Sequence, residues 1–170
     1  MNIIVRLTRA LYEHALEDLR RPHAHAYERV GFASTKTANL AGGGLLVLVT
    51  EYHPLPDERY IEDRSVGARI DSDAIRGAMQ RVLDTGRGAF HIHLHDLPGR
   101  TNFSGPDREG IPPVVDALRV AGPREAHGMI VFGHQHARAE VWAPGAAAAA
   151  VADRVTVVGR PLFIFDKERL

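Results

Sequence analysis

The sequence contains no cysteine. This absence excludes disulfide bonds, thiolate zinc sites and cysteine nucleophiles, and it is compatible with a reducing cytoplasm. Basic residues (Lys and Arg) and acidic residues (Asp and Glu) each number 21, so the formal net charge is zero. A balanced charge gives no general reason to expect nucleic acid or an anionic membrane as a partner. We therefore expect a cytoplasmic protein that binds neither.

Long hydrophobic runs are also missing. The longest apolar stretch in the middle of the chain, LAGGGLLVLVT at residues 40–50, is too short to cross a bilayer. The first ten residues, MNIIVRLTRA, are too few and too charged for a secretory signal. A chain of 170 residues can build one hydrophobic core but not two ordinary domains. We expect a single domain over residues 1–170.

Hydrophobic spacing predicts alternating helices and strands. Helical patterns cover residues 9–22, 71–86 and part of 104–122. Strand patterns cover residues 27–35, 44–55, 88–95, 154–159 and 161–166, with a hairpin over 127–143. The alanine-rich residues 143–153 suit a loop or a short helix, and the internal glycine run at 42–44 suits a turn that leads into a strand. This order predicts an α/β or α+β domain.

The strongest chemical pattern lies in FHIHLHDLPGRTNFSGPD, residues 90–107. His91, His93 and His95 alternate along a predicted strand, so their side chains share one face of it. Histidine is the commonest metal ligand, and a catalytic zinc needs three protein ligands and one open position. Asp107 supplies a third ligand if the chain loops back after His95 and begins a helix near Ser104. The pattern therefore predicts a metal site with Ser104 one helical turn from a ligand.

Two further His-x-His pairs weaken any argument from histidine alone. His134 and His136 fall at the predicted hairpin turn, and His23 and His25 follow a proline. Neither pair has a Ser-x-x-Asp behind it, so turn or loop polarity is the simpler interpretation of both. Their roles stay open.

The segments HLH at residues 93–95 and SGPD at 104–107 resemble the His-x-His and Ser-x-x-Asp signature of the JAMM (JAB1/MPN+) metalloproteases. That family also carries an upstream glutamate on an early strand, which Glu28 in YERVGF matches. The resemblance implies an MPN/JAB-like three-layer domain, with a mixed β-sheet flanked by helices. It also implies that His93, His95 and Asp107 hold Zn²⁺, with catalytic roles for Glu28 and Ser104.

The sequence departs from the family pattern at two points. The spacer between His95 and Ser104 is one residue longer than usual, and Asp96 stands where the family usually has proline. The longer spacer leaves His91 and His93 as an alternative ligand pair, although His93 and His95 keep closer to the family spacing.

The upstream glutamate also has a rival. Glu51, at the end of a predicted strand, is the alternative to Glu28. Glu28 matches the family better because a glycine follows it three residues later and because it comes after the first predicted helix.

The resemblance implies amide hydrolysis. Zinc would lower the pKa of a bound water, Glu28 would take its proton and pass it to the leaving amine, and Ser104 would help to stabilise the oxyanion. The implied substrate is a ubiquitin-like modifier, cleaved after its C-terminal glycine in deconjugation or in tail maturation. Bacterial members of the family accompany E1-like and E2-like proteins, some of them in antiphage conjugation systems.

Two other functions remain open at this point. One is a non-catalytic MPN-type scaffold, which keeps the fold and lacks the ligands. The other is a different zinc amidohydrolase, for example one that processes a sulfur-carrier protein. For an enzyme that acts on a modifier, the polar residues 54–67 and the loop at Phe103 are candidate recognition surfaces. Residues 54–67 could equally form a plain loop.

Overall fold

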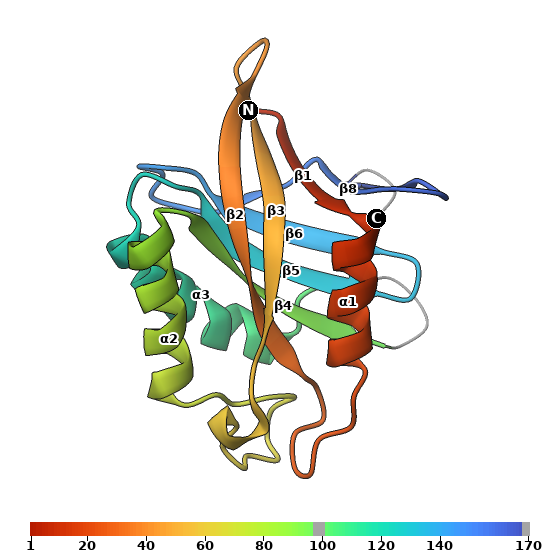
Figure 1. The fold of residues 1–170 in the computed structure, drawn as a ribbon, viewed down its shortest axis with the longest axis vertical. Helices are drawn as coiled ribbons and strands as arrows, with labels where there is room; N and C mark the ends of the chain where they lie inside the picture. The colour runs from red at the N-terminus through yellow and green to blue at the C-terminus, as the bar shows by residue number, and fades with distance from the viewer. Residues whose placement is uncertain (97–100, 168–170) are drawn as a thin grey trace.

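A mixed nine-stranded sheet forms the centre of the protein (Figure 1). The structure is a computed structural model that describes residues 1–96 and 101–167. The strands are β1 (Ile3–Thr8), β2 (Val30–Leu40), β3 (Gly44–Pro54), β4 (Gly88–His95), β5 (His127–Gly133), β6 (Ala137–Trp142), β7 (Ala150–Val151), β8 (Arg154–Val158) and β9 (Phe163–Asp166). The helices are α1 (Arg9–Leu19), α2 (Ser72–Thr85) and α3 (Gly105–Ala121), with a short 3-10 helix, η1 (Asp57–Arg59).

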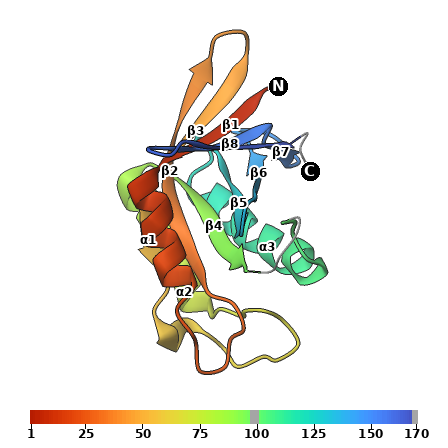
Figure 2. The ribbon, with the colours of Figure 1, turned by 90° about the vertical axis from the view of Figure 1, so that its right-hand side faces the viewer.

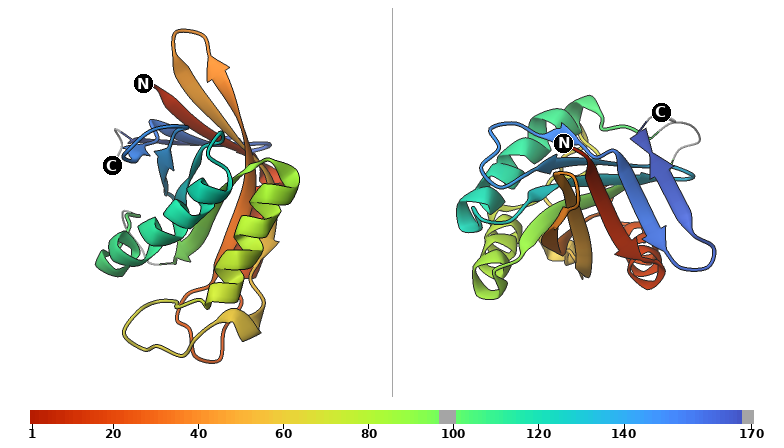
Figure 3. Two further views of the ribbon diagram at one scale, coloured as in Figure 1. Left: turned by 90° about the vertical axis from the view of Figure 1, so that its left-hand side faces the viewer. Right: turned by 90° about the horizontal axis from the view of Figure 1, so that it is seen from above.

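The strands follow the order β7-β6-β5-β4-β2-β3-β1-β8-β9 across the sheet. Strand β1 runs parallel to both β3 and β8, and β4 runs parallel to β5. The remaining neighbours pair antiparallel. The long hairpin of β2 and β3 extends beyond the other strands, as Figures 1 and 3 show. Its turn holds Gly42 and Gly43 at positive φ, which confirms the predicted glycine turn.

Helices cover both faces of the sheet. Helix α1 lies on one face and α3 on the other (Figure 2), and α2 packs beside α3 (Figure 3). The side chains of β4 explain this division, because alternate residues of a strand point to opposite faces. Phe90, Ile92 and Leu94 join the large core beneath α1. His91 and His93 point the other way, toward α3. The protein is therefore a mixed α+β structure with helices on both faces.

Most of the elements predicted from the sequence are confirmed, but three predictions need correction. The sequence reading did not predict β1, a short strand whose last residue, Thr8, also caps α1 by accepting a hydrogen bond from Leu11 N. Helix α3 begins directly after Ser104 and continues through Pro112 and Pro113 to Ala121, so it covers nearly all of residues 104–122 instead of part of them. Strand β2 begins only at Val30, so the residues just before it belong to a loop.

The helices were also compared with the requirements of a membrane span. Within residues 1–96 and 101–167, none of them combines the length and the hydropathy that crossing a bilayer requires.

A buried polar contact ties α1 to the sheet. The hydroxyl of Tyr52 on β3 donates to Asp18 Oδ2 of α1 at 2.8 Å, and Arg21 pairs with the other carboxylate oxygen at 2.7 Å. The ring of Tyr52 also lies against Gly31 of β2, where a Cβ atom would collide with it. The contact therefore fixes the first helix against the two long strands.

We predict that Tyr52→Phe lowers the free energy of unfolding by about 1–3 kcal/mol, because it removes a buried hydrogen bond to a charged acceptor. Urea denaturation measures the change. Tyr27→Phe is the matched control, since the Tyr27 side chain is 70% exposed, and its effect should stay within about 0.5 kcal/mol. Equal stability of Tyr52→Phe and the native protein would contradict the assigned role of the contact.

Candidate metal centre

Four side chains converge where β4 ends and α3 begins. Glu28, His93, His95 and Asp107 each offer one ligand atom, and these atoms all lie within 4.8 Å of one another. Glu28 comes from the loop before β2, the histidines from the last residues of β4, and Asp107 from the first turn of α3. The structure thus brings together three separate segments of the chain, and the group could hold a metal ion.

The histidines contribute the most buried part of this group. His93 is 1% exposed, and neither of its ring nitrogens has a hydrogen-bond partner within the described residues. His93 Nε2 lies 3.4 Å from Asp107 Oδ2, and His95 Nε2 lies 3.3 Å from the same oxygen. Buried polar atoms without partners are costly and rare in folded proteins. A cation at this position would satisfy His93, so the donor set fits a metal ion.

Asp107 is held by the start of its own helix. Ser104 is the N-cap residue of α3, and its backbone N and its hydroxyl both donate to Asp107 Oδ2 at 2.7 Å. In return, Asp107 N donates to Ser104 Oγ at 3.2 Å. This arrangement is a capping box, which satisfies two backbone donors at the helix end. The Ser-x-x-Asp motif therefore has a local structural role and also aims the Asp107 carboxylate at the two histidines.

The charges of the group support one another. Burial alone would raise the pKa of Asp107, but the imidazoles of His93 and His95 and the hydroxyl of Ser104 outweigh it and hold that pKa well below its usual range. The Asp107 carboxylate in turn raises the pKa of His95. Burial raises the pKa of the Glu28 carboxyl, although the nearby histidines oppose this shift. Asp107 is thus the fixed anion of the site, while Glu28 is the carboxyl closer to taking up a proton.

The sequence predicted that Glu28 lies on a strand, but the residue lies in a loop. Its backbone N donates to Gly67 O at 3.0 Å, so the chain pairs with residue 67 instead of extending β2. A Cβ atom on Gly67 would lie 2.5 Å from Glu28 Oε2, so a larger residue at this position would require the carboxylate to shift. Gly67 is therefore a positioning residue that the sequence reading missed, because its partner is distant along the chain.

The residue after Glu28 anchors the same loop. The buried guanidinium of Arg29 donates to Arg21 O at 2.9 Å and to Asp57 Oδ1 at 2.7 Å. The hydroxyl of Tyr60 bonds both the N and the O of Val30. Segment 54–67, considered above as a recognition surface or a plain loop, contributes Asp57, Tyr60 and Gly67 to this support. Part of it is thus structural.

The two alternative residues, Glu51 and His91, are not members of the four-residue group. Glu51 is exposed and forms ion pairs with Arg87 and His53, outside the cluster. His91 is buried next to His93 and lines a neighbouring cavity, but it is not a member of the four-residue group. Burial lowers the pKa of His91 to about 3, so its ring is neutral. The geometry therefore favours Glu28 over Glu51, and the pair His93 and His95 over the pair His91 and His93.

The remaining histidine pairs and Phe103 lie outside the metal-ligand group. His134 and His136 follow β5 in the turn of the confirmed hairpin, and His23 and His25 pack on each other in the loop after α1; within the described chain none of the four joins a metal-ligand group. Phe103 is buried among side chains of α3, β5 and β6, so it anchors its loop and does not offer a contact surface.

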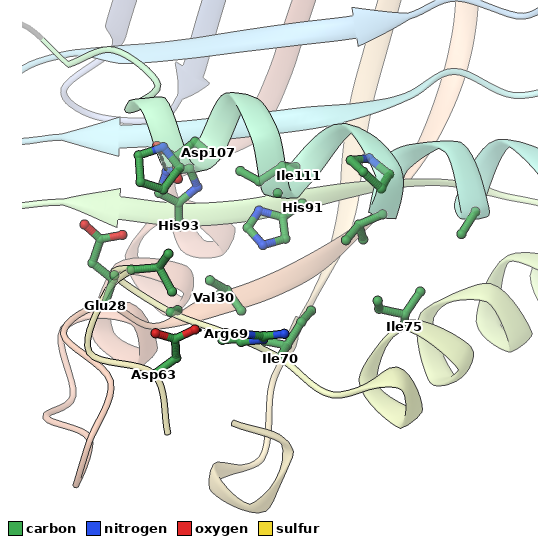
Figure 4. A pocket seen from close by; sticks show the side chains of 18 residues that line it. Glu28, Val30, Asp63, Arg69, Ile70, Ile75, His91, His93, Asp107 and Ile111 are labelled. Atoms are coloured by element: carbon green, nitrogen blue, oxygen red, sulfur yellow. Dashed lines mark hydrogen bonds and ion pairs between the residues drawn. The ribbon is translucent and has the colours of Figure 1, made fainter. Parts of the chain in front are cut away.

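Two cavities meet the site, and Glu28 lines both. The apolar cavity, of about 480 Å³, runs from Glu28, His93 and Asp107 along α3 toward α2 (Figure 4). The polar cavity, of about 570 Å³, lies on the side of His95. Its wall contains Arg20, Arg21, His23, Glu28, His95 and Asp96. The metal-ligand group therefore borders two cavities, and the wall of the one beside His95 carries charged side chains.

Comparison with known proteins does not extend this interpretation, since no protein-family model and no curated protein matches the sequence.

We predict that the purified protein binds about one Zn²⁺ per chain, since the site offers enough ligands for one ion. His93→Ala and Asp107→Ala should each remove most of the metal, and added zinc should raise the melting temperature of the native protein but not of these two variants. Elemental analysis and thermal unfolding measure the two effects. His134→Ala is the control and should keep full occupancy. Full occupancy in both site variants would refute the ligand assignment.

Proposed function

We propose that the protein is a zinc-dependent isopeptidase or peptidase of the JAMM type, with an MPN/JAB-like fold. The observation that carries the proposal is the convergence of Glu28 with His93, His95 and Asp107 beside the capped start of α3. The order of these residues along the chain also agrees with the family resemblance. A non-catalytic scaffold is disfavoured, because a scaffold has no need for a ligand set around a buried histidine whose ring nitrogens lack hydrogen-bond partners among the described residues.

His93, His95 and Asp107 are the proposed zinc ligands. When bound, zinc supplies a Lewis acid and a water of lowered pKa at the open position. His93, which is buried, and His95, which borders the polar cavity, would hold the ion. Asp107 contributes a negative charge that the N-terminus of α3 and the Ser104 hydroxyl keep in place. No cysteine is required for this chemistry.

Glu28 is the proposed general base and acid. Its Oε1 atom lies 3.6 Å from His95 Nε2, and its carboxyl borders both cavities. A group at this junction reaches the attacking water and the leaving amine in turn, so it can take a proton from one and deliver it to the other. The elevated pKa of Glu28 in the absence of metal agrees with a carboxyl that is able to hold a proton.

Ser104 has two roles in this proposal. In the structure its hydroxyl donates to Asp107 Oδ2 at 2.7 Å. A hydroxyl has a single proton, so stabilising the oxyanion requires Ser104 to turn its hydrogen bond from Asp107 to the substrate oxygen. The backbone N of Ser104 would continue to hold Asp107 during that exchange. The two roles are therefore compatible.

The proposed substrate is a ubiquitin-like modifier joined through its C-terminal glycine to a lysine or to a short tail. E1-like and E2-like proteins would then be its functional partners, in the cytoplasm. A flexible tail offers too little surface for selectivity, so recognition should use a surface away from the zinc. Exposed positions of segment 54–67, such as Ile61 and Glu62, are available for that contact.

We predict that Glu28→Gln keeps zinc but loses at least about a hundredfold in cleavage rate, because glutamine preserves the shape beneath Gly67 and cannot transfer the proton. Zinc content and initial rates on one cleavable substrate are measured together. Glu51→Gln serves as the control and should cleave at the native rate. If Glu28→Gln stays within about tenfold of the native rate, Glu28 is not the base.

We further predict chelator-sensitive release of a reporter fused behind the terminal glycine of a modifier encoded near this protein's gene. Mass spectrometry locates the cut, and Glu28→Gln is the inactive control. Cleavage after the terminal glycine supports the modifier substrate. If the zinc protein hydrolyses a small amide and no modifier fusion, the modifier assignment is wrong and the other zinc amidohydrolase stands.

A further inference from the structure

Strand β9 forms an open edge of the sheet. It is the final member of the strand order, and within residues 1–96 and 101–167 only β8 pairs with it. The right-hand view of Figure 3 shows this strand, in dark blue, at the side of the molecule. An open edge presents backbone donors and acceptors that can pair with another chain, so proteins usually protect it. The opposite edge is protected in this way, because β7 has only two residues.

The side chains of β9 do not protect its edge. The inner residues Phe163, Ile164 and Phe165 carry no charge, and the carboxylate of Asp166 already has an arginine partner on β8. Ile164 is 43% exposed, and Leu162, directly before the strand, is 55% exposed. An apolar edge strand without lysines or inward-pointing charges is a template for pairing with a further strand.

Two phenylalanine rings extend the main core to this edge. The rings of Phe163 and Phe165 stack with their centroids 6.2 Å apart, and both pack against the core beneath α1. The guanidinium of Arg9 lies over the Phe163 ring, 4.7 Å from its centroid. Both rings are nevertheless only half-buried. The core therefore ends at β9 with aromatic surface still exposed, and a further strand would cover it.

The hydrogen bonds to β8 show which backbone groups of β9 face the open edge. Antiparallel neighbours alternate between hydrogen-bonded and non-hydrogen-bonded pairs. Lys167 N donates to Asp153 O at 2.9 Å, so this pair is hydrogen-bonded. The register continues from it, two residues at a time, to Phe165 and Phe163, which therefore bond β8. The backbone N–H and C=O of Ile164, which lies between them, point to the open edge.

We propose that β9 pairs antiparallel with β9 of a second copy of this chain, about a two-fold axis at Ile164. Ile164 then exchanges two backbone hydrogen bonds with Ile164 of the second copy, and Phe163 lies opposite Phe165 of that copy. An axis at Phe165 would place Ile164 opposite the carboxylate of Asp166. An axis at Phe163 would place Phe165 opposite Pro161, which lies outside the strand. The axis at Ile164 pairs the three inner residues of β9 with one another.

A second copy fits this edge because the contact is self-complementary. A strand pair about a two-fold axis uses the same surface on both chains, so the assembly closes at two subunits. Pairing β9 with β7 of another copy would use only two residues and would leave an open edge at each end. An edge of four residues is smaller than a standard interface, so we expect a weak dimer with a Kd in the micromolar range. The contact does not involve the metal-ligand group, so the proposal goes beyond the proposed function and is independent of it.

Sedimentation velocity of the full-length protein, from about 5 µM to about 1 mM, measures this dimer. Ile164→Lys places two ammonium groups at the axis and should raise the Kd at least about tenfold, because like charges directly opposite each other destabilise a strand pair. Leu83→Lys is the matched control, since Leu83 is an exposed apolar residue on α2. It should dimerise as the native protein does. Melting temperatures show whether both variants stay folded.

The absence of cysteine allows a direct test of the register. In the proposed pair the two Cα atoms of residue 164 lie about 5.5 Å apart, which is within the range of a disulfide. Ile164→Cys should therefore form a disulfide-linked dimer on mild oxidation, visible on a non-reducing gel. Val158→Cys is the control, because Val158 is exposed on β8 and lies one strand further from the axis. It should remain monomeric.

The possible outcomes are distinct. A native protein that stays monomeric over the whole concentration range refutes the proposal, and this is also the result if a different protein covers the edge. A dimer that persists in Ile164→Lys refutes it too, because another surface then holds the two copies. A disulfide at residue 158 and none at residue 164 refutes the two-fold axis. A dimer in the native protein and in Leu83→Lys, weakened in Ile164→Lys and cross-linked at residue 164, supports the proposal. Removal of zinc should leave the dimer unchanged, so a failure of the proposed function is a separate result.

Discussion

The carboxylate of Asp107 joins the start of α3 to the end of β4, and the arrangement of the site depends on it. One of its oxygens accepts two hydrogen bonds from Ser104 and lies within 3.4 Å of a nitrogen of both His93 and His95. The same oxygen atom of Asp107 thus caps the start of α3 and faces the two histidines. The cap fixes where α3 begins, and the histidines fix where that beginning must lie against the sheet. Any change that moves the helix start therefore moves the candidate metal ligand as well.

The opposite wall of the site is built differently. Glu28 lies in a loop whose backbone bonds Gly67, and the next residue buries its guanidinium against Asp57. Loops over a surface are usually mobile. This loop is held in place by the buried Arg29 guanidinium, which donates to the exposed Asp57 carboxylate, and by the Tyr60 hydroxyl, which bonds Val30 at its end. Segment 54–67 therefore has two faces, one that supports Glu28 and one that is exposed for contact with other molecules.

Sequence reasoning predicted those parts of the molecule that depend on local patterns. The alternation of β4 and the Ser104 cap are local, so the strand and the start of α3 follow from the sequence pattern, while the choice of His93 and His95 over His91 and His93 came from the family resemblance. Glu28 came from the family resemblance, and its placement on a strand was wrong because a contact with Gly67, 39 positions away (67 − 28), replaces the strand pairing. Gly67, Arg29 and the apolar cavity depend on contacts between distant segments, for which the sequence contains no periodic signal.

Strand β4 carries core residues on one face and candidate metal ligands on the other, so it connects the fold to the site. Phe90, Ile92 and Leu94 are buried in the core beneath α1, so a substitution on that face would disturb the packing of the core. The other face carries imidazoles, and both ring nitrogens of the buried His93 lack a hydrogen-bond partner within residues 1–96 and 101–167. A buried, unsatisfied histidine destabilises a protein, and selection for stability alone would replace it with an apolar residue. An ion that binds only the folded state would repay this cost by mass action. The stability of the sheet and the occupancy of the candidate metal centre are therefore linked through a single strand.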